Sequence, residues 1–182
     1  MNTPRRPGIL ARLRDETRAE HDAIELALDW EARAASRKSY AEWLARMHGF
    51  HEVWEPAIAD ALSDPTFFDP RRKLHLLEED LRALGAKPHQ RPSAITFATQ
   101  AEALGSLYVL EGSTLGGQLI ARHVRSSLGF APAYHEGYGT RTGEMWRSFR
   151  QRLEEATALA DEDATIAAAA KTFHDLREWL TD

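Results

Sequence analysis

His21 is the side chain in this sequence best placed to bind a metal from within a helix. Apolar residues recur around it at steps of three or four, at positions 10, 13, 24 and 28, and predict an apolar helix face with the ring directed inward. A neutral imidazole is a common metal ligand, and Glu25, one turn later, could accept a hydrogen bond from the second ring nitrogen. Alternatively, His21 is an ordinary hydrogen-bonded core histidine and Glu25 is solvated. A second feature of the sequence is needed to distinguish these two interpretations.

That second feature is a group of glycines at positions 112, 116 and 117. Each glycine inside a helix costs roughly 1 kcal/mol relative to alanine, so the three together cost about 3 kcal/mol and need a compensating gain. Gly112 and Gly116 are four residues apart and share one face, which would let a flat ligand approach the backbone closely. Tight packing of one helix on another is the alternative. With His21 as the opposite wall, these glycines predict a planar slot.

Positive charge lies along one edge of this predicted slot. Arg14 and Arg18 precede His21 by two turns and one turn of helix. Anionic groups of a ligand in the slot could emerge beside them, although exposed salt bridges are the alternative for both arginines.

The elements that must position these residues are all predicted to be helices. Alanine, leucine, glutamate and arginine dominate, valine occurs only three times, and no stretch alternates apolar with polar residues. We expect one all-α domain over residues 1–182, with a flexible N-terminus at residues 1–8. The predicted helices cover residues 9–30, 36–62, 69–84, 93–128 (two helices or one kinked helix), 142–159 and 163–180. Pro56 could bend the second helix, Asp69 with Pro70 starts the third, Gly85 and Gly129 end helices, and residues 131–143 form an ordered loop.

Composition excludes several classes of function. The chain has no cysteine, so disulfides, thiolate metal ligands and a cysteine nucleophile are absent. A net charge of -5 gives no general attraction to nucleic acid. The first residues are not followed by an apolar run of signal or membrane-spanning length, so we expect a cytoplasmic protein with no membrane partner.

Other candidate sites in the sequence are weaker. A di-metal carboxylate site at His48, His51, Glu52 and Glu55 lacks the required Glu-x-x-His unit. A serine hydrolase is disfavoured because no Gly-x-Ser-x-Gly elbow is present. The remaining histidines are predicted to lie in polar settings without a specific role; they are His75, His89, His123 and His135.

Two segments resemble the haem oxygenase family, and specifically its bacterial members associated with bacteriophytochromes. Residues 13–25, LRDETRAEHDAIE, are similar to the family's proximal helix, with a threonine four residues before the histidine and a glutamate four residues after it. Residues 108–118, YVLEGSTLGGQ, are similar to its distal helix. Weaker similarity runs through residues 40–55, 146–153 and 173–179.

The resemblance implies a helical bundle with haem between the first helix and a kinked, glycine-rich distal helix. Haem b would be both cofactor and substrate, cleaved by O2 to biliverdin, carbon monoxide and iron. The sequence carries no flavin or nucleotide fingerprint, so electrons would come from an external donor, a ferredoxin or reductase. A bacteriophytochrome is a possible recipient of the biliverdin.

The resemblance also assigns roles to individual residues. His21 is the axial ligand of the haem iron, and Gly112, Ser113 and Gly116 are the catalytic residues of the distal side. The expected haem-binding residues are His21, Arg14, Glu25, Tyr108, Gly112, Gly116, Gly117 and Arg177, with His174 as an alternative to Arg177. Ser113 stands where mammalian members carry an aspartate that organises water, so ordered water on backbone carbonyls is expected to supply protons instead.

Two other readings of the haem slot remain open at this point. A non-catalytic haem carrier would use the same histidine and the same slot. A thiaminase-like enzyme would share the architecture without haem, although its usual acidic and cysteine residues are not evident.

Overall fold

The computed structural model describes residues 7–91, 93–157 and 161–181. These residues form helices and connecting segments with no strand among them, so the predicted all-α class is confirmed. Residues 1–6 of the predicted flexible N-terminus lie outside the described residues. The elements in chain order are α1 Ile9–Glu16, α2 Arg18–Leu28, α3 Trp30–Arg33, α4 Arg37–Leu62, α5 Pro65–Phe68, η1 Asp69–Arg71, α6 Leu74–Leu84, α7 Gln100–Leu128, α8 Ala133–Glu136, η2 Gly139–Arg141, α9 Thr142–Thr157 and α10 Glu162–Thr181.

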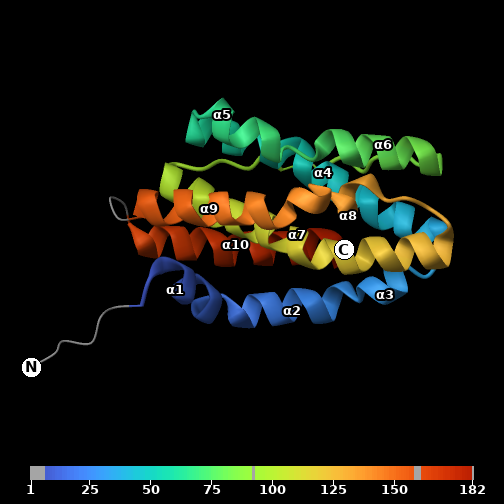
Figure 1. The fold of residues 1–182 in the computed structure, drawn as a ribbon, viewed down its shortest axis with the longest axis horizontal. Coiled ribbons are helices and arrows are strands. Elements are labelled where there is room, and N and C mark those ends of the chain that lie inside the picture. Colours follow the sequence, from blue (N-terminus) through green and yellow to red (C-terminus); the bar gives the residue numbers. More distant parts are fainter. Residues whose placement is uncertain (1–6, 92, 158–160, 182) are drawn as a thin grey trace, which may run out of the picture.

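The long helices α4, α7 and α10 form the centre of the bundle. Helix α10 packs along α7 and also contacts α2 and α4, while α9 lies on α7 and α6 lies on α4. Figure 1 shows α1, α2 and α3 as one outer layer and α5 and α6 on the opposite side. The core is filled by large side chains from α4, α7 and α9, including Tyr40, Leu44, Phe50, Trp54, Ile58, Leu104, Leu107, Phe149 and Leu153.

Local capping signals set the ends of the two longest helices. Ser36 starts α4 in a reciprocal capping box with Ser39, and Pro56 lies inside α4 without ending it. Thr99 accepts a hydrogen bond from the Glu102 amide, so α7 begins at Gln100 and not at the predicted residue 93. Gly129 ends α7 with a φ of 58°, as predicted. Of the two forms predicted for this segment, two separate helices are ruled out, because a single helix runs from Gln100 to Leu128.

The predicted first helix is instead three pieces. Thr17 leaves the helical conformation with φ -105° and ψ 8°, and its hydroxyl donates to the Leu13 carbonyl. Asp29 has a φ of 41°, and its carboxylate accepts from the Ala32 amide at the start of α3. Both breaks are built from local side-chain bonds, so α2 is a separate segment whose direction is set at Thr17 and Asp29.

The predicted third helix starts later than its sequence signal. Residues 69–71 form the short η1 helix, and α6 begins at Leu74. The amides of Lys73 and Leu74 donate to Glu55, a residue of α4, so a tertiary contact caps α6. Gly85 ends α6 with a φ of 67°, as predicted. The predicted loop 131–143 contains α8 and η2.

No helix among the described residues is long and apolar enough to cross a bilayer. The predicted cytoplasmic location stays a prediction.

Candidate functional site

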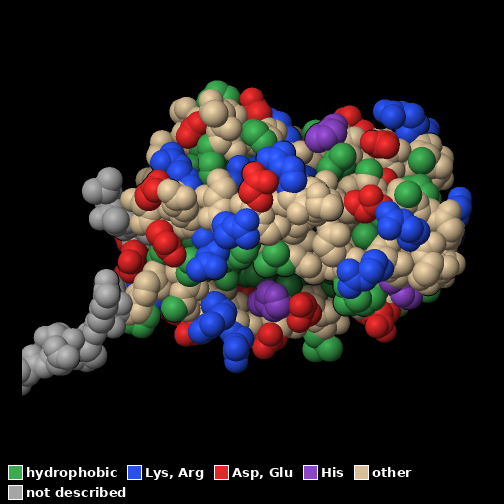
Figure 2. Space-filling view, in the orientation of Figure 1, with side chains coloured by type: hydrophobic (Ala, Val, Ile, Leu, Met, Phe, Trp, Pro, Cys, Tyr) green, Lys and Arg blue, Asp and Glu red, His purple; other side chains and the backbone are tan. Residues whose placement is uncertain are grey.

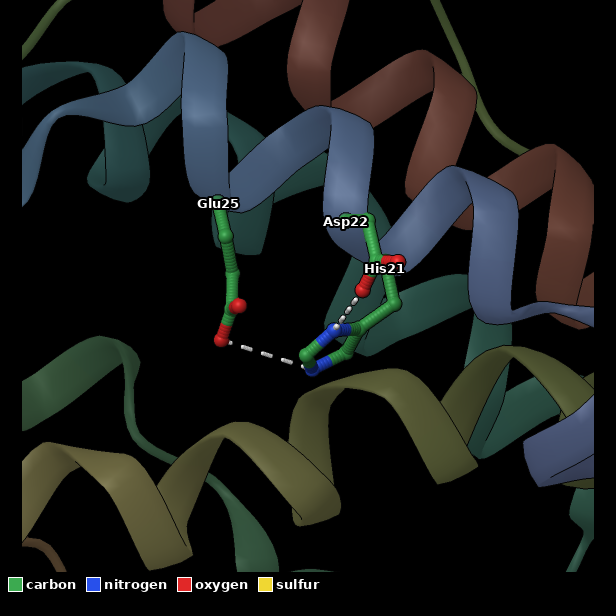
Figure 3. Close-up of side chains that lie close together, drawn as sticks. All are labelled: His21, Asp22 and Glu25. Atoms are coloured by element: carbon green, nitrogen blue, oxygen red, sulfur yellow. Dashed lines mark ion pairs between the residues drawn. The ribbon is translucent and has the colours of Figure 1, made fainter.

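The His21 ring projects from α2 toward α7 (Figure 3). Its side chain is 51% exposed and meets the Phe173 ring edge-on at 5.7 Å. The prediction that the ring points into the core is therefore wrong. The inward face of this segment is occupied by Thr17 and Ile24, which are buried, and His21 lies on the flank that faces α7. This placement leaves the imidazole accessible to a ligand.

Contacts at both ends of this segment fix its register against α7. At one end Arg14 lies close enough to Tyr108 to affect its ionisation, since burial raises the pKa of Tyr108 and the Arg14 charge lowers it. At the other end the Trp30 ring meets the His123 ring edge-on at 5.4 Å. Positions 14 and 30 thus pair with positions 108 and 123. Interpolation between the pairs places His21 opposite the stretch of α7 that carries Gly112 and Gly116.

The glycines of α7 fall into two groups by what lies opposite their missing side chains. A Cβ atom at Gly116 would have no heavy atom within 4 Å, and one at Gly112 would meet only Trp146, at 4.0 Å. A Cβ atom at Gly117 would lie 2.9 Å from the His135 carbonyl oxygen, and one at Gly105 would lie 2.0 Å from the Thr165 carbonyl oxygen. Gly112 and Gly116 therefore offer open backbone surface, whereas Gly117 is used for packing against α8.

The space between α2 and α7 is a recess with apolar walls. Leu115 and Leu119 on α7 are 47% and 53% exposed, which is unusual for leucines beside a packed core. Figure 2 shows this face hollowed between the layer of α1 and α2 and the layers beside it, with Lys and Arg side chains on both sides of the hollow. Positions 108 and 123 are about 22 Å apart along α7 at 1.5 Å per residue, and the open backbone of Gly112 and Gly116 lies between them.

Two carboxylates flank the His21 ring. Asp22 Oδ1 lies 3.7 Å from Nδ1, and Glu25 Oε1 lies 3.6 Å from Nε2 (Figure 3). The sequence indicated only Glu25 as a partner, and the neighbouring Asp22 was missed although it precedes Glu25 by one turn. Among the described residues, these three are the group whose ligand atoms could hold a metal ion together.

Ser113 does not present a free hydroxyl to the recess. Its Oγ donates to the Leu110 carbonyl at 2.8 Å, and the Thr114 hydroxyl likewise donates to the Glu111 carbonyl at 2.6 Å. The proton of each hydroxyl is therefore held by the backbone of α7.

The two predicted arginine partners lie at the margins of the recess. Arg14 is 68% exposed and pairs with Asp15 at 3.0 Å. Arg177 bonds Glu178 at 3.0 Å and the His174 ring at 3.3 Å, and it lies one turn beyond Phe173 on α10. Both arginines are held by exposed neighbours and can reorient toward a ligand.

Two aromatic residues of the site could not be predicted from the sequence. Phe173 contacts His21, and Trp146 lies against Gly112 and 5.9 Å from the Tyr108 ring. Their helical spacing matches that of ordinary core residues, so only the tertiary arrangement identifies them.

The prediction that His135 lies in a polar setting is wrong. It is 6% exposed, its Nδ1 lies 2.6 Å from the Tyr40 hydroxyl, and burial lowers its pKa to about 3. It joins the core at α8, which packs on the Gly117 backbone.

The alternative di-metal cluster on α4 is structural. His51 Nδ1 lies 3.0 Å from Glu55 Oε1, but the same oxygen also accepts from the amides of Lys73 and Leu74 at 2.8 and 2.9 Å. That oxygen is fully used as the cap of α6, and Glu52 is exposed. This arrangement leaves no open set of metal ligands there.

Comparison with known proteins gives a consistent result. The family model described as Heme oxygenase matches residues 8–182. A heme oxygenase of Xanthomonas campestris pv. campestris is 36% identical over 146 residues, covering 75% of this chain and 87% of the relative. The structure of the NO- and CO-bound heme oxygenase from Neisseria meningitidis superposes with a TM-score of 0.82 at 24% identity, covering 96% of this chain and 91% of that chain. The heme oxygenase from Leptospira interrogans gives a TM-score of 0.75 at 17% identity, covering 96% and 99%.

Proposed function

Because this chain belongs to the haem oxygenase family, we propose that it holds its haem substrate between α2 and α7, with His21 on one face and Gly112 and Gly116 on the other. The chain is a haem-degrading oxygenase, and a non-catalytic carrier is not favoured. One observation carries the assignment of the residues. The half-exposed His21 ring lies opposite the part of α7 whose glycines have open space beside their backbone.

The residues present fit a haem group in their chemistry. Gly112 and Gly116 lie on α7 between positions 108 and 123, the two points at which Arg14 and Trp30 approach this helix. Leu115 and Leu119 provide apolar contacts, and the open glycine backbone allows a flat ring to approach α7. Imidazole is a normal axial ligand for haem iron.

Each side chain has a defined task in this proposal. His21 would hold the haem iron, and the carboxylates of Asp22 and Glu25, which lie 3.7 and 3.6 Å from its two ring nitrogens, would orient the ring. Arg14 and Arg177 bind the propionates from the margins of the recess, and Tyr108 lines the same end as Arg14. Gly117 is left out of the set because it packs against α8.

The protein contributes positioning and water control to the reaction. Haem and O2 supply the chemistry of ring opening when bound, and the products are biliverdin, carbon monoxide and iron. Since the Ser113 hydroxyl already donates to the Leu110 carbonyl, we propose that ordered water held at the α7 backbone delivers protons beside Gly112. Apolar contacts from Leu115 and Leu119 limit how much other water enters.

We also propose a source for the electrons and a recipient for the product. The sequence has no nucleotide-binding fingerprint, so a separate ferredoxin or reductase supplies the electrons. A bacteriophytochrome is the proposed recipient of biliverdin, on the resemblance of residues 13–25 and 108–118 to bacterial members of this kind.

A haem titration tests the residue assignment. One equivalent of hemin is added to the wild type, to His21→Ala and to the control His75→Ala, which removes an exposed histidine from α6. Ascorbate or a ferredoxin system is then supplied in air while the visible spectrum is followed. We expect a sharp Soret band and its conversion to bilin absorption in the wild type and the control, and loss of both in His21→Ala.

The other outcomes are equally informative. A His21-dependent Soret band that does not decay would indicate a carrier. An unchanged Soret band and unchanged turnover in His21→Ala would reject His21 as the ligand.

A further inference from the structure

The indole ring of Trp146 lies beside the open backbone of Gly112. Trp146 belongs to α9, which packs on α7 and also contacts α1. A Cβ atom built at Gly112 would lie 4.0 Å from Cη2, the tip of this indole, and would meet no other described residue as closely outside the neighbouring backbone of α7. A Cβ atom at Gly116, one turn further on, would meet nothing within 4 Å. The open surface of α7 is therefore bounded by Trp146 at Gly112 and continues from there toward Gly116.

Aromatic neighbours fix the position of the Trp146 ring. It stacks on the Phe149 ring, with 5.6 Å between the centroids and 25° between the planes. Phe149 is fully buried in the core, so this contact gives the indole a rigid support. The Tyr108 ring lies 5.9 Å away at an angle of 43°. Trp146 is itself partly buried, and its ring forms a firm wall of the haem recess.

Two sides of the recess are closed by rings from different helices. On the side of α10, the buried Phe173 ring contacts His21. On the side of α9, Trp146 stands at Gly112. The exposed Leu115 and Leu119 lie about one and two turns beyond Gly112 on α7. A flat ring seated on the glycines is thus held away from α9 by Trp146 and extends along α7 over the leucines.

The end of the recess near Tyr108 presents a charged and an apolar partner. Arg14 and Trp146 both neighbour Tyr108, Arg14 through its charge and Trp146 through ring contact. The atom of Trp146 nearest Gly112 is a carbon, which offers a carboxylate no hydrogen bond. A propionate turned from Arg14 onto this edge would lose water without gaining a donor there. Trp146 therefore favours the arrangement in which the propionates lie at Arg14 and an apolar edge of the porphyrin lies at the indole.

The four meso carbons of haem differ only in the groups on the neighbouring pyrrole rings. A protein selects one of them by fixing the rotation of the haem in its own plane. On the basis of the proposed haem-binding function, we propose that Trp146 is a specificity-determining residue, which holds the haem in one in-plane rotation and so selects the meso carbon that is opened. Without the indole, this side of the recess is open toward α9, where the exposed Arg150 lies one turn beyond position 146 and offers the propionates a second cation.

Proton NMR of the ferric, cyanide-ligated complex counts the haem rotations without any turnover. The haem used carries methyl groups in place of both vinyl groups, because its symmetric periphery leaves in-plane rotation as the one source of separate signal sets. We expect one set of haem methyl signals in the wild type and at least two sets in Trp146→Ala and Trp146→Leu. Trp146→Phe keeps a ring beside Gly112 and should keep one set. The control Gln151→Ala removes an exposed side chain of α9 that bonds Glu155 at 2.9 Å, and it should behave like the wild type.

Turnover of natural haem gives a second readout. Chromatography of the biliverdin should show one isomer from the wild type, Trp146→Phe and the control, and a mixture of isomers from Trp146→Ala and Trp146→Leu. Two results would overturn the proposal. One is more than one signal set in the wild type. The other is a single signal set and an unchanged isomer in both Trp146→Ala and Trp146→Leu, while circular dichroism and the Soret band show that both are folded and loaded with haem.

Failure of this role for Trp146 is distinguishable from failure of the proposed function. If His21 is not the ligand, His21→Ala keeps the Soret band of the wild type, whatever the Trp146 variants do. If His21 is the ligand and Trp146 only supports the fold, the Trp146 variants should lower the free energy of unfolding and still give one signal set. That second result rejects the role of Trp146 alone.

Discussion

At the scale of single residues, the glycines of α7 show that the same residue type serves two different purposes. Gly105 and Gly117 let neighbouring backbones approach to distances that no side chain would allow. Gly112 and Gly116 have no such neighbour, and their cost to helix stability is not offset by packing. The stability lost at Gly112 and Gly116 therefore has to be offset by a bound ligand. An experiment can distinguish these two glycines from the glycines used for packing.

Alanine substitutions at Gly116 and Gly105 should change the stability of the protein in opposite directions. Gly116→Ala should raise the stability of the hemin-free protein by about 0.5–1 kcal/mol, since it removes backbone freedom without a clash, and should weaken hemin binding. Gly105→Ala places a Cβ atom 2.0 Å from the Thr165 carbonyl oxygen and should destabilise by about 3 kcal/mol or more. Urea unfolding and hemin titration of both variants provide the measurement. Equal destabilisation by the two substitutions would contradict this account of Gly116.

His135 should make the protein sensitive to acid. Its pKa in the folded state is about 3 because of burial, whereas an unfolded histidine titrates near 6.5. Between pH 6.5 and pH 3 this histidine is therefore protonated in the unfolded state but not in the folded state. The free energy of unfolding falls with the pH over this range, by up to about 1.4 kcal/mol per pH unit. Asp80 acts in the opposite sense between pH 6 and 3.8, because burial raises its pKa to about 6.

Comparison with His135→Gln isolates the histidine from these other groups. Between pH 7 and pH 5 the wild type should lose about 2 kcal/mol more of its unfolding free energy than the variant does. Glutamine can still accept a hydrogen bond from Tyr40, which lies 2.6 Å from His135 Nδ1. Urea unfolding at the two pH values gives the difference directly, and parallel losses in both proteins would show that His135 is not the titrating group.

At the scale of elements, a buried polar cluster joins α4, α6 and α7. Glu55 of α4 caps α6 through the amides of Lys73 and Leu74. The Lys73 ammonium in turn lies 3.3 Å from Glu111, the residue before Gly112, and Tyr138 donates to the same carboxylate. Burial lowers the pKa of Lys73 and Glu111 opposes this, so the two charges depend on each other. The cluster fixes the α7 wall of the haem recess from behind.

Removal of one charged side chain from this cluster should lower the free energy of unfolding more than removal of two oppositely charged side chains. Glu111→Leu leaves Lys73 buried without its carboxylate and should destabilise by about 3–5 kcal/mol. Addition of Lys73→Met should restore more than half of that loss. Arg71 Nε also lies 3.6 Å from Glu111 Oε2, so both variants leave the buried Arg71 without this carboxylate, and the double variant should keep part of the loss. The carbonyls of Phe67 and Met145 still accept hydrogen bonds from Arg71. Chemical unfolding of the single and double variants tests this, and strictly additive losses would refute the coupling.

The helices could be predicted from sequence where local capping decides their ends. Ser36, Gly85 and Gly129 mark boundaries that the structure confirms. The start of α6 could not be found in this way, because its cap, Glu55, comes from another helix. In the candidate site, His21 and the open glycine pair carry a local pattern, whereas Phe173 and Trp146 look like core residues until the fold brings them to the recess.

At the scale of the whole molecule, the two sides of the haem recess are anchored very differently. Helix α7 lies at the centre of the bundle, between α10, α9 and α4. Helix α2 lies in the outer layer, and Ile24 is its one buried residue among those described. The recess thus has one fixed wall and one wall that opens with little loss of buried surface.

Hydrogen–deuterium exchange should show this asymmetry. Amides of α2 should exchange faster than those of α4 in the hemin-free protein, and hemin should slow exchange mainly in α2 and around residues 112–116. The protection in α2 should be reduced in His21→Ala. Similar protection throughout α6 would indicate general stabilisation of the bundle and would contradict a localised effect.

The breaks at Thr17 and Asp29 also constrain how this chain can change in length during evolution. A deletion or insertion of one residue between Thr17 and His21 would turn the imidazole about 100° around α2, away from α7. Unlike a substitution, such a change cannot be compensated by a nearby side chain. Length differences among functional relatives should therefore avoid the 14–30 segment and fall in connectors such as residues 86–99, where the chain is not tied to the register of the haem recess.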